Sequence, residues 1–145
     1  MDEFISLYEY FPDLVEKETA VIDIKRTGSN RLFAGEYLLL ESYCNGKECD
    51  CRKVMLNVVP SSQPGFILAT VGYGWETTQF YAVWAFGDME LARWMRGVYL
   101  EPMCIQSMCS ETFLQLVKIK VRDKSFRLAT IRHYKLFKDF LVKHD

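Results

Sequence analysis

The pattern of hydrophobic and polar positions divides this chain into an early part with strand signals and a late part with helix signals. The early segments are short, rich in branched and aromatic residues, and bounded by turn-forming residues, which is typical of strands. Turn residues at 27–30 and 61–65 separate some of them. The last segment, 79–86, is apolar on both sides and is therefore predicted to be a central strand. The predicted strands cover residues 19–25, 35–43, 52–59, 66–73 and 79–86.

Helix signals are concentrated after residue 87, where Asp or Ser capping residues precede segments of helical period. A short helix is also expected within residues 4–15, with an interruption at Pro12. Because strands precede helices, the order predicts one α+β domain over residues 1–145, with an antiparallel sheet and the C-terminal helices packed on it. The predicted late helices cover residues 88–95, 110–121 and about 125–144.

Three cysteines occupy a short polar stretch between two predicted strands, Cys44-Asn45-Gly46-Lys47-Glu48-Cys49-Asp50-Cys51-Arg52. Asn-Gly favours a hairpin turn, so Cys44 is expected to end one strand while Cys49 and Cys51 begin the next. Residues i and i+2 of a strand point to the same side, so the three sulfurs can converge on one ion. Thiolates favour soft metals, most often zinc. Arg52 and Lys53 are placed to offset the excess negative charge.

Apolar packing and disulfide formation are the two roles that compete with metal binding for these thiols. Free cysteines are usually buried as small hydrophobic residues, but this stretch is otherwise polar. A disulfide framework is disfavoured because the five cysteines are an odd number and no signal peptide opens the sequence. The lack of an export signal also predicts a reducing, cytoplasmic location.

A closed zinc site requires a fourth ligand, and His133 is the leading candidate. At the helical period His133 shares a face with apolar residues, so it is expected to point into the core. A core histidine that only forms hydrogen bonds is the competing interpretation. With His133 as ligand, Zn²⁺ would clip the last helix to the hairpin. The apolar face comprises Phe126, Ala129, His133, Phe137, Phe140 and Leu141.

Cys104, Cys109 and Asp50 remain as alternative fourth ligands. The two cysteines have the same separation as Cys44 and Cys49, but their neighbours are apolar, which is typical of packed thiols. Asp50 is the weakest candidate, because alternation along a strand turns it away from the cysteines on either side.

Composition and charge narrow the range of functions. Half of the 145 residues are hydrophobic and 14 % are aromatic, which indicates a folded globular protein. A net charge of −1 opposes generic binding to polyanions, and no apolar run is long enough to span a bilayer. The last part of the chain is basic, however. Nucleic-acid binding through the C-terminal helices is therefore a lesser alternative, without a module motif to support it.

Catalytic motifs are mostly absent from the sequence. It has no Gly-rich phosphate loop, no His-Glu-x-x-His and no nucleophile elbow. A catalytic zinc keeps an open position beside an acid or base, and Glu41 and Glu48 are the carboxylates near the thiols. An open-site zinc hydrolase is thus the enzymatic alternative, while the leading hypothesis assigns no catalytic residue.

Several short pieces of the chain carry a resemblance to known proteins. They are Gly35-Glu36-Tyr37, Glu41-Ser42-Tyr43-Cys44, Cys49-Asp50-Cys51-Arg52-Lys53-Val54 and Arg132-His133-Tyr134. In these pieces the chain resembles a group of uncharacterised prokaryotic proteins that have a Cys-x4-Cys-Asp-Cys-Arg loop and a late His-Tyr pair, some of which continue into a SEC-C-type zinc tail. The resemblance covers most of the chain from about Glu18 onward, implies that His133 is paired with the thiols, and brings no assigned activity.

These inferences combine into one functional hypothesis. The chain is expected to be a small cytoplasmic zinc-binding protein with a structural Zn²⁺ held by Cys44, Cys49, Cys51 and His133. Such a protein would act as an accessory or interaction module with a protein partner, and membrane binding is not expected. The sequence specifies neither the partner nor the biological process.

Overall fold

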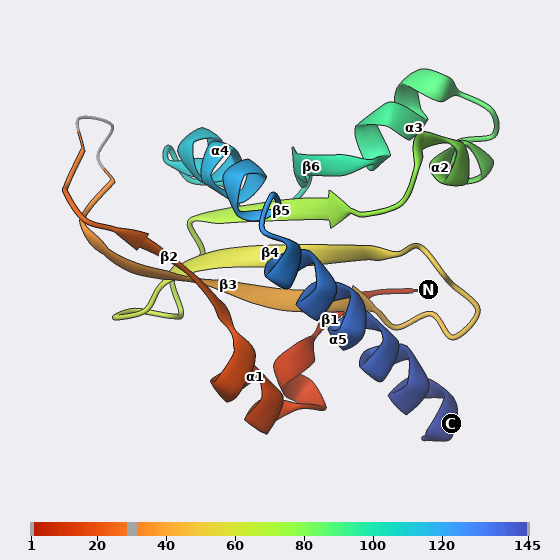
Figure 1. Ribbon diagram of the computed structural model, residues 1–145, viewed down its shortest axis with the longest axis horizontal. Helices are drawn as coiled ribbons and strands as arrows, with labels where there is room; N and C mark the ends of the chain where they lie inside the picture. Colours follow the sequence, from red (N-terminus) through yellow and green to blue (C-terminus); the bar gives the residue numbers. More distant parts are fainter. Residues whose placement is uncertain (1, 29–31, 145) are drawn as a thin grey trace.

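The computed structural model describes residues 2–28 and 32–144, and within these ranges the chain forms a six-stranded sheet with helices packed against it (Figure 1). All neighbouring strands are antiparallel, in the order β1-β3-β4-β5-β6, and β2 also pairs with β3. The strands are β1 (Phe4–Ser6), β2 (Ala20–Ile24), β3 (Gly35–Cys44), β4 (Lys53–Pro60), β5 (Ala69–Gly74) and β6 (Gly97–Leu100).

The helices follow the strands for the most part, and the two longest are the last (Figure 1). Helices α4 and α5 lie across the sheet and contact its central and edge strands. The expected α+β fold, an antiparallel sheet with C-terminal helices packed on it, is therefore confirmed. The helices are η1 (Leu7–Glu9), α1 (Pro12–Glu18), α2 (Thr78–Trp84), α3 (Met89–Met95), α4 (Ser110–Lys120) and α5 (Lys124–Lys143).

The core lies between the sheet and the two C-terminal helices. Val54, Leu56 and Val58 alternate along β4 and are fully buried, as expected for residues that share one face of a strand. From the helix side, Phe137 of α5 packs on the ring of Tyr43 at a centroid distance of 5.7 Å. Full burial of each large apolar side chain contributes about 1.5–3 kcal/mol to stability, so this layer holds α5 over β3 and β4.

The predicted central strand at residues 79–86 is wrong, because most of this segment forms helix α2. Thr77 caps the helix, since its side-chain oxygen accepts a hydrogen bond from the backbone N–H of Phe80 at 3.1 Å. A short apolar run looks the same in a buried strand and in a helix, so periodicity alone could not separate them. The place beside β5 is taken instead by β6, which the sequence pattern did not reveal.

The N-terminal segment also differs from the expected interrupted helix. Residues 4–6 form β1, and Pro12 begins α1 instead of breaking a helix. Proline suits the first helical position because its missing N–H would have no partner there. The predicted turn at 27–30 lies partly outside the described residues. Among the helices of the described ranges, none is both long enough and apolar enough to cross a membrane.

Candidate metal centre

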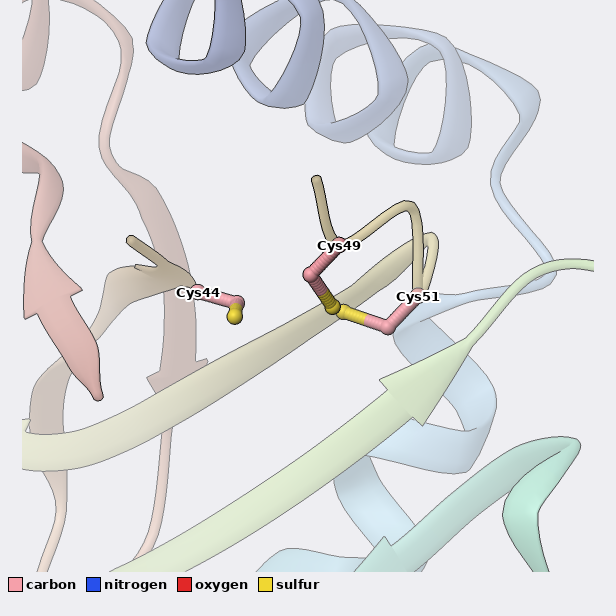
Figure 2. A group of neighbouring side chains, drawn as sticks. All are labelled: Cys44, Cys49 and Cys51. Atoms are coloured by element: carbon pink, nitrogen blue, oxygen red, sulfur yellow. The ribbon is translucent and has the colours of Figure 1, made fainter. Parts of the chain in front are cut away.

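Three cysteines meet at one end of the sheet, and we call Cys44, Cys49 and Cys51 the thiol cluster (Figure 2). Their sulfur atoms all lie within 4.8 Å of one another, and none of them forms a disulfide. Sulfurs bound at the usual Zn–S distance in a tetrahedral site are roughly 3.8 Å apart. The predicted convergence of the three thiols is therefore present, and the cluster could hold a metal ion.

The backbone around Cys44 is fixed by the N-terminal strand. Cys44 is the last residue of β3 and pairs with Phe4 of β1. The next residue, Asn45, exchanges hydrogen bonds with Glu3: its N–H donates to the Glu3 carbonyl at 2.7 Å, and its side-chain oxygen accepts from the Glu3 N–H at 2.8 Å. A Cβ on Gly46 would lie 2.3 Å from the Asp2 carboxylate. The Asp2 side chain therefore lies directly against the loop at this glycine.

The loop differs from the predicted tight hairpin. β4 begins only at Lys53, so Cys49 and Cys51 lie in the loop and not at the start of a strand. The N–H of Gly46 donates to the sulfur of Cys44 at 3.4 Å, and the N–H of Cys49 donates to the Gly46 carbonyl at 3.2 Å. These turns, and not strand alternation, bring Cys49 and Cys51 toward Cys44. The predicted convergence of the three thiols is thus present, but the geometric reason given for it, strand alternation, was wrong.

The chain leaves the loop through a left-handed residue, Arg52, with a φ of 51°. This conformation is unusual for a residue other than glycine, and the surrounding hydrogen bonds hold it in place. The N–H of Arg52 donates to the Tyr134 hydroxyl at 3.3 Å, and the Arg52 carbonyl accepts from the Tyr81 hydroxyl at 2.8 Å. Tyr134 in turn donates to Asp50 at 2.7 Å. Helix α5 thus anchors the residues on both sides of Cys51.

Burial and the neighbouring thiols raise the pKa values of Cys44 and Cys51. Burial is the largest cause for Cys51, and the neighbouring Cys49 and Cys44 add to it, which raises its pKa to about 12. Burial also raises the pKa of Cys44. A divalent cation at the cluster would reverse this effect, because it favours the thiolate forms that metal binding requires. Three thiolates without a cation are therefore unfavourable in this cluster, whereas a bound cation would stabilise them.

Helix α5 brings a positive charge, that of Lys138, close to the cluster. The ammonium group of Lys138 donates to the carbonyls of Cys44 at 2.7 Å and Gly46 at 2.9 Å, and its charge favours the thiolate forms of both Cys44 and Cys51. The sequence did not single out Lys138. Its position could have been inferred from the sequence, because Lys138 follows Tyr134 by four residues and the two side chains therefore share one face of the helix.

The predicted charge-offsetting role of Arg52 and Lys53 is not supported by their positions. The guanidinium of Arg52 bonds to Asp50 at 2.8 Å and to Glu76 at 3.2 Å, and it lies over the ring of Phe80. Lys53 directs its ammonium group toward the ring of Tyr99 at 4.8 Å. Both cations are therefore used in contacts away from the thiols.

His133 is buried as predicted, at 1 % exposure, but the structure does not bring it to the thiols. Its Nδ1 lies 2.9 Å from a carboxylate oxygen of Glu41, and its Nε2 lies 3.1 Å from one of Glu18. The Tyr43 hydroxyl donates to the same Glu41 carboxylate. Because both ring nitrogens already face carboxylates, His133 is not the fourth ligand in this arrangement. Its surroundings are those of the competing interpretation, a core histidine that only forms hydrogen bonds.

Two facing carboxylates favour the charged form of the His133 imidazole. A neutral imidazole has only one N–H, so it can donate to Glu41 or to Glu18 but not to both. Burial lowers the pKa of His133, but the hydrogen bonds and charges of the two carboxylates raise it by more, so the pKa lies above its ordinary value. We call these three residues the carboxylate–histidine cluster; it links α1, β3 and α5.

The alternative fourth ligands are not in the thiol cluster either. Asp50 bonds to Arg52 and to Tyr134, Cys104 is exposed, and Cys109 is buried in the hydrophobic core. Within residues 2–28 and 32–144, the three cysteines are joined by no further His, Cys, Asp or Glu. A metal ion bound by this cluster would therefore complete its coordination with a water molecule or another external donor.

Replacing Tyr134 with phenylalanine should loosen the loop, because it removes the hydroxyl that joins Arg52 to Asp50. We expect a loss of about 1–2 kcal/mol of stability and a roughly tenfold weaker affinity for metal, since groups that orient the ligands matter nearly as much as the ligands. Denaturant unfolding and competitive metal titration would measure both. Tyr8→Phe, at an exposed tyrosine, is the matched control; equal metal affinity in both variants would contradict the role of Tyr134.

The fold and the site together define an α+β protein with a three-cysteine cluster that could hold a metal ion. Comparison with protein-family models, curated proteins and solved structures finds no match to this chain. A functional proposal for this protein therefore rests on the geometry of the thiol cluster.

Proposed function

We propose that this protein is a zinc-binding accessory or interaction module in which Cys44, Cys49 and Cys51 hold one structural Zn²⁺. The observation that carries this proposal is the convergence of three sulfurs within 4.8 Å, two of them on buried residues. Thiolates select soft or borderline ions, and zinc is the commonest structural ion among them. Bound there, zinc would join the end of β3 to the loop that enters β4.

The surroundings of the cluster favour a structural role over a catalytic one. Three protein ligands with an open position also describe catalytic zinc sites, but those need a nearby acid or base. The hydrogen bond from Arg52 is the largest cause that lowers the pKa of Asp50, and Tyr134 also donates to it. Such a carboxylate is a poor proton acceptor. Glu41 is engaged with His133 and Tyr43, away from the thiols.

Metal analysis of protein purified without chelator tests the proposal. We expect one equivalent of zinc per chain, and less than about half an equivalent would contradict a zinc site. Cys51→Ser should lose the zinc, whereas Cys104→Ser should keep it, because Cys104 is exposed and outside the cluster. His133→Gln should also keep it, which separates this site from one with a histidine ligand.

X-ray absorption at the zinc edge gives an independent measurement of the ligands. We expect three sulfurs at about 2.3 Å and one lighter atom at about 2.0 Å. Four sulfurs would mean that a further thiol completes the site, and mainly nitrogen and oxygen ligands would contradict the thiol cluster as the zinc site.

A further inference from the structure

Helices α2 and α3 form a hairpin that stands off the end of the sheet beyond β5 (Figure 1). The core of this hairpin is small, since its buried residues are Tyr81, Ala85 and Ala92. It forms a cluster separate from the main core of the protein. Much of the apolar surface of the hairpin is therefore left on the outside.

The outward surface of residues 78–95, all of which the structure describes, is unusually apolar. Single exposed hydrophobic residues are normal on a soluble protein, but this short segment carries six large ones. Exposed apolar side chains concentrated in this way are typical of an interaction site. The six side chains are between 40 % and 99 % exposed, and they are Val83, Trp84, Phe86, Met89, Leu91 and Trp94.

Phe86 at the tip of the hairpin is both strained and almost completely exposed. It follows the last turn of α2 with a φ of 53°, and the N–H of Gly87 closes the turn on the Ala82 carbonyl at 2.9 Å. This hydrogen bond is that of a helix end whose left-handed residue is usually glycine, because a Cβ is unfavourable there. The side chain of Phe86 is 99 % exposed. A costly conformation that directs an aromatic ring into solvent indicates a partner for that ring.

The charges of α3 identify the kind of partner. The helix begins with Asp88 and Glu90 and ends with Arg93, followed by Arg96. If two copies of α3 pair in antiparallel fashion about a two-fold axis, the acidic end of each meets the basic end of the other. An anionic bilayer, by contrast, would be repelled by the two acidic residues that lie close to Phe86 in the sequence.

We propose that the α2–α3 hairpin is the interface of a two-fold homodimer, in which Phe86 of each copy packs on the hairpin of the other. The exposed face of the hairpin is distinct from the thiol cluster, but the two are neighbours, because the Tyr81 hydroxyl of α2 donates to the Arg52 carbonyl beside Cys51. The interface uses the six exposed apolar side chains as its centre and the charged ends of α3 as its rim.

Sedimentation analysis of the full chain, with zinc present, across micromolar to submillimolar concentrations tests the proposal. We expect a concentration-dependent dimer, and Phe86→Gly should weaken it at least about tenfold. The same substitution relieves the backbone strain, so the monomer should melt at the same or a higher temperature. Phe66→Ala, at an exposed phenylalanine outside the hairpin, should leave the dimer unchanged.

Charge reversal tests the antiparallel arrangement. Glu90→Arg and Arg93→Glu should each weaken the dimer, and the double variant should recover most of the lost affinity because the pairing is restored with opposite signs. A chain that stays monomeric at all concentrations would overturn the proposal, as would a dimer that Phe86→Gly leaves intact. Binding of the monomer to phosphatidylcholine or phosphatidylserine vesicles, lost in Phe86→Gly, would identify a membrane surface instead and would equally overturn it.

Discussion

Replacing Cys51 with serine is expected to lower the melting temperature of the zinc-loaded protein by about 10 °C or more. A metal ion that binds only the folded chain adds its binding free energy to folding. Cys51 is buried, and burial together with the neighbouring thiols raises its pKa to about 12. Its loss removes one of the three proposed zinc ligands.

Two controls separate zinc binding from the packing of the cysteine side chain. Cys104→Ser should have the same melting temperature as the wild type, since Cys104 is exposed and does not belong to the cluster. Removal of zinc from the wild type with a chelator should lower its melting temperature to nearly that of Cys51→Ser. If the variant melts within a few degrees of the zinc-loaded wild type, zinc is not a structural element of this fold.

His133→Gln is expected to destabilise the protein by about 3–5 kcal/mol at neutral pH, because it leaves the buried Glu41 without its charged partner. The side chains of His133 and Glu41 are 2 % and 6 % exposed, so water cannot replace the lost contact. A glutamine amide can donate to one of the two carboxylates but brings no charge. Urea unfolding at pH 7 would measure this loss.

The same cluster should make the stability of the wild type depend on pH. The pKa of His133 in the folded protein is raised above its ordinary value of 6.5. The stability that the charged form contributes is therefore fully present below about pH 6.5 and is lost as the pH rises through the folded pKa. The groups that face His133 are Glu41 of β3 and Glu18 of α1, and Glu18 also pairs with Arg132.

Unfolding free energies measured from about pH 5.5 to 9 would test this dependence. We expect a decline toward high pH in the wild type and a flatter curve in His133→Gln. His144→Gln, which removes the second histidine at an exposed position, should retain the decline. Equal pH dependence in all three proteins would show that His133 is not charged in the folded state.

Local sequence patterns predicted the elements whose signals lie within a few residues. Branched and aromatic residues between turn signals gave the correct interpretation of β3 and β4, and capping residues located α3 and α5. Ser110, the predicted cap of α4, is instead its first helical residue, and Cys109 before it makes no side-chain capping hydrogen bond. The segment at 79–86 failed because an apolar run of that length fits a strand and a helix equally well. β1 and β6 are three and four residues long, and only pairing with β3 and β5 makes them strands.

The candidate metal site was predicted only in part, because only some of its residues are close together in the sequence. Three thiols within eight positions of the sequence must lie close together, so Cys44, Cys49 and Cys51 were recognisable from their spacing alone. The role of His133 depended on where the last helix crosses the sheet. That crossing places His133 between Glu41 and Glu18, and it places Tyr134 and Lys138 at the loop.

The sequence by itself determined the fold class and the grouping of the three thiols, because both depend on short-range patterns and spacing. Only the tertiary structure decided which side of α5 meets which part of the sheet, since that register results from packing between residues about ninety positions apart. A shift of one helical residue turns the direction of a side chain by about 100°. The partners of His133 and the anchoring of the thiol loop therefore could not be known before the helix was seen in place.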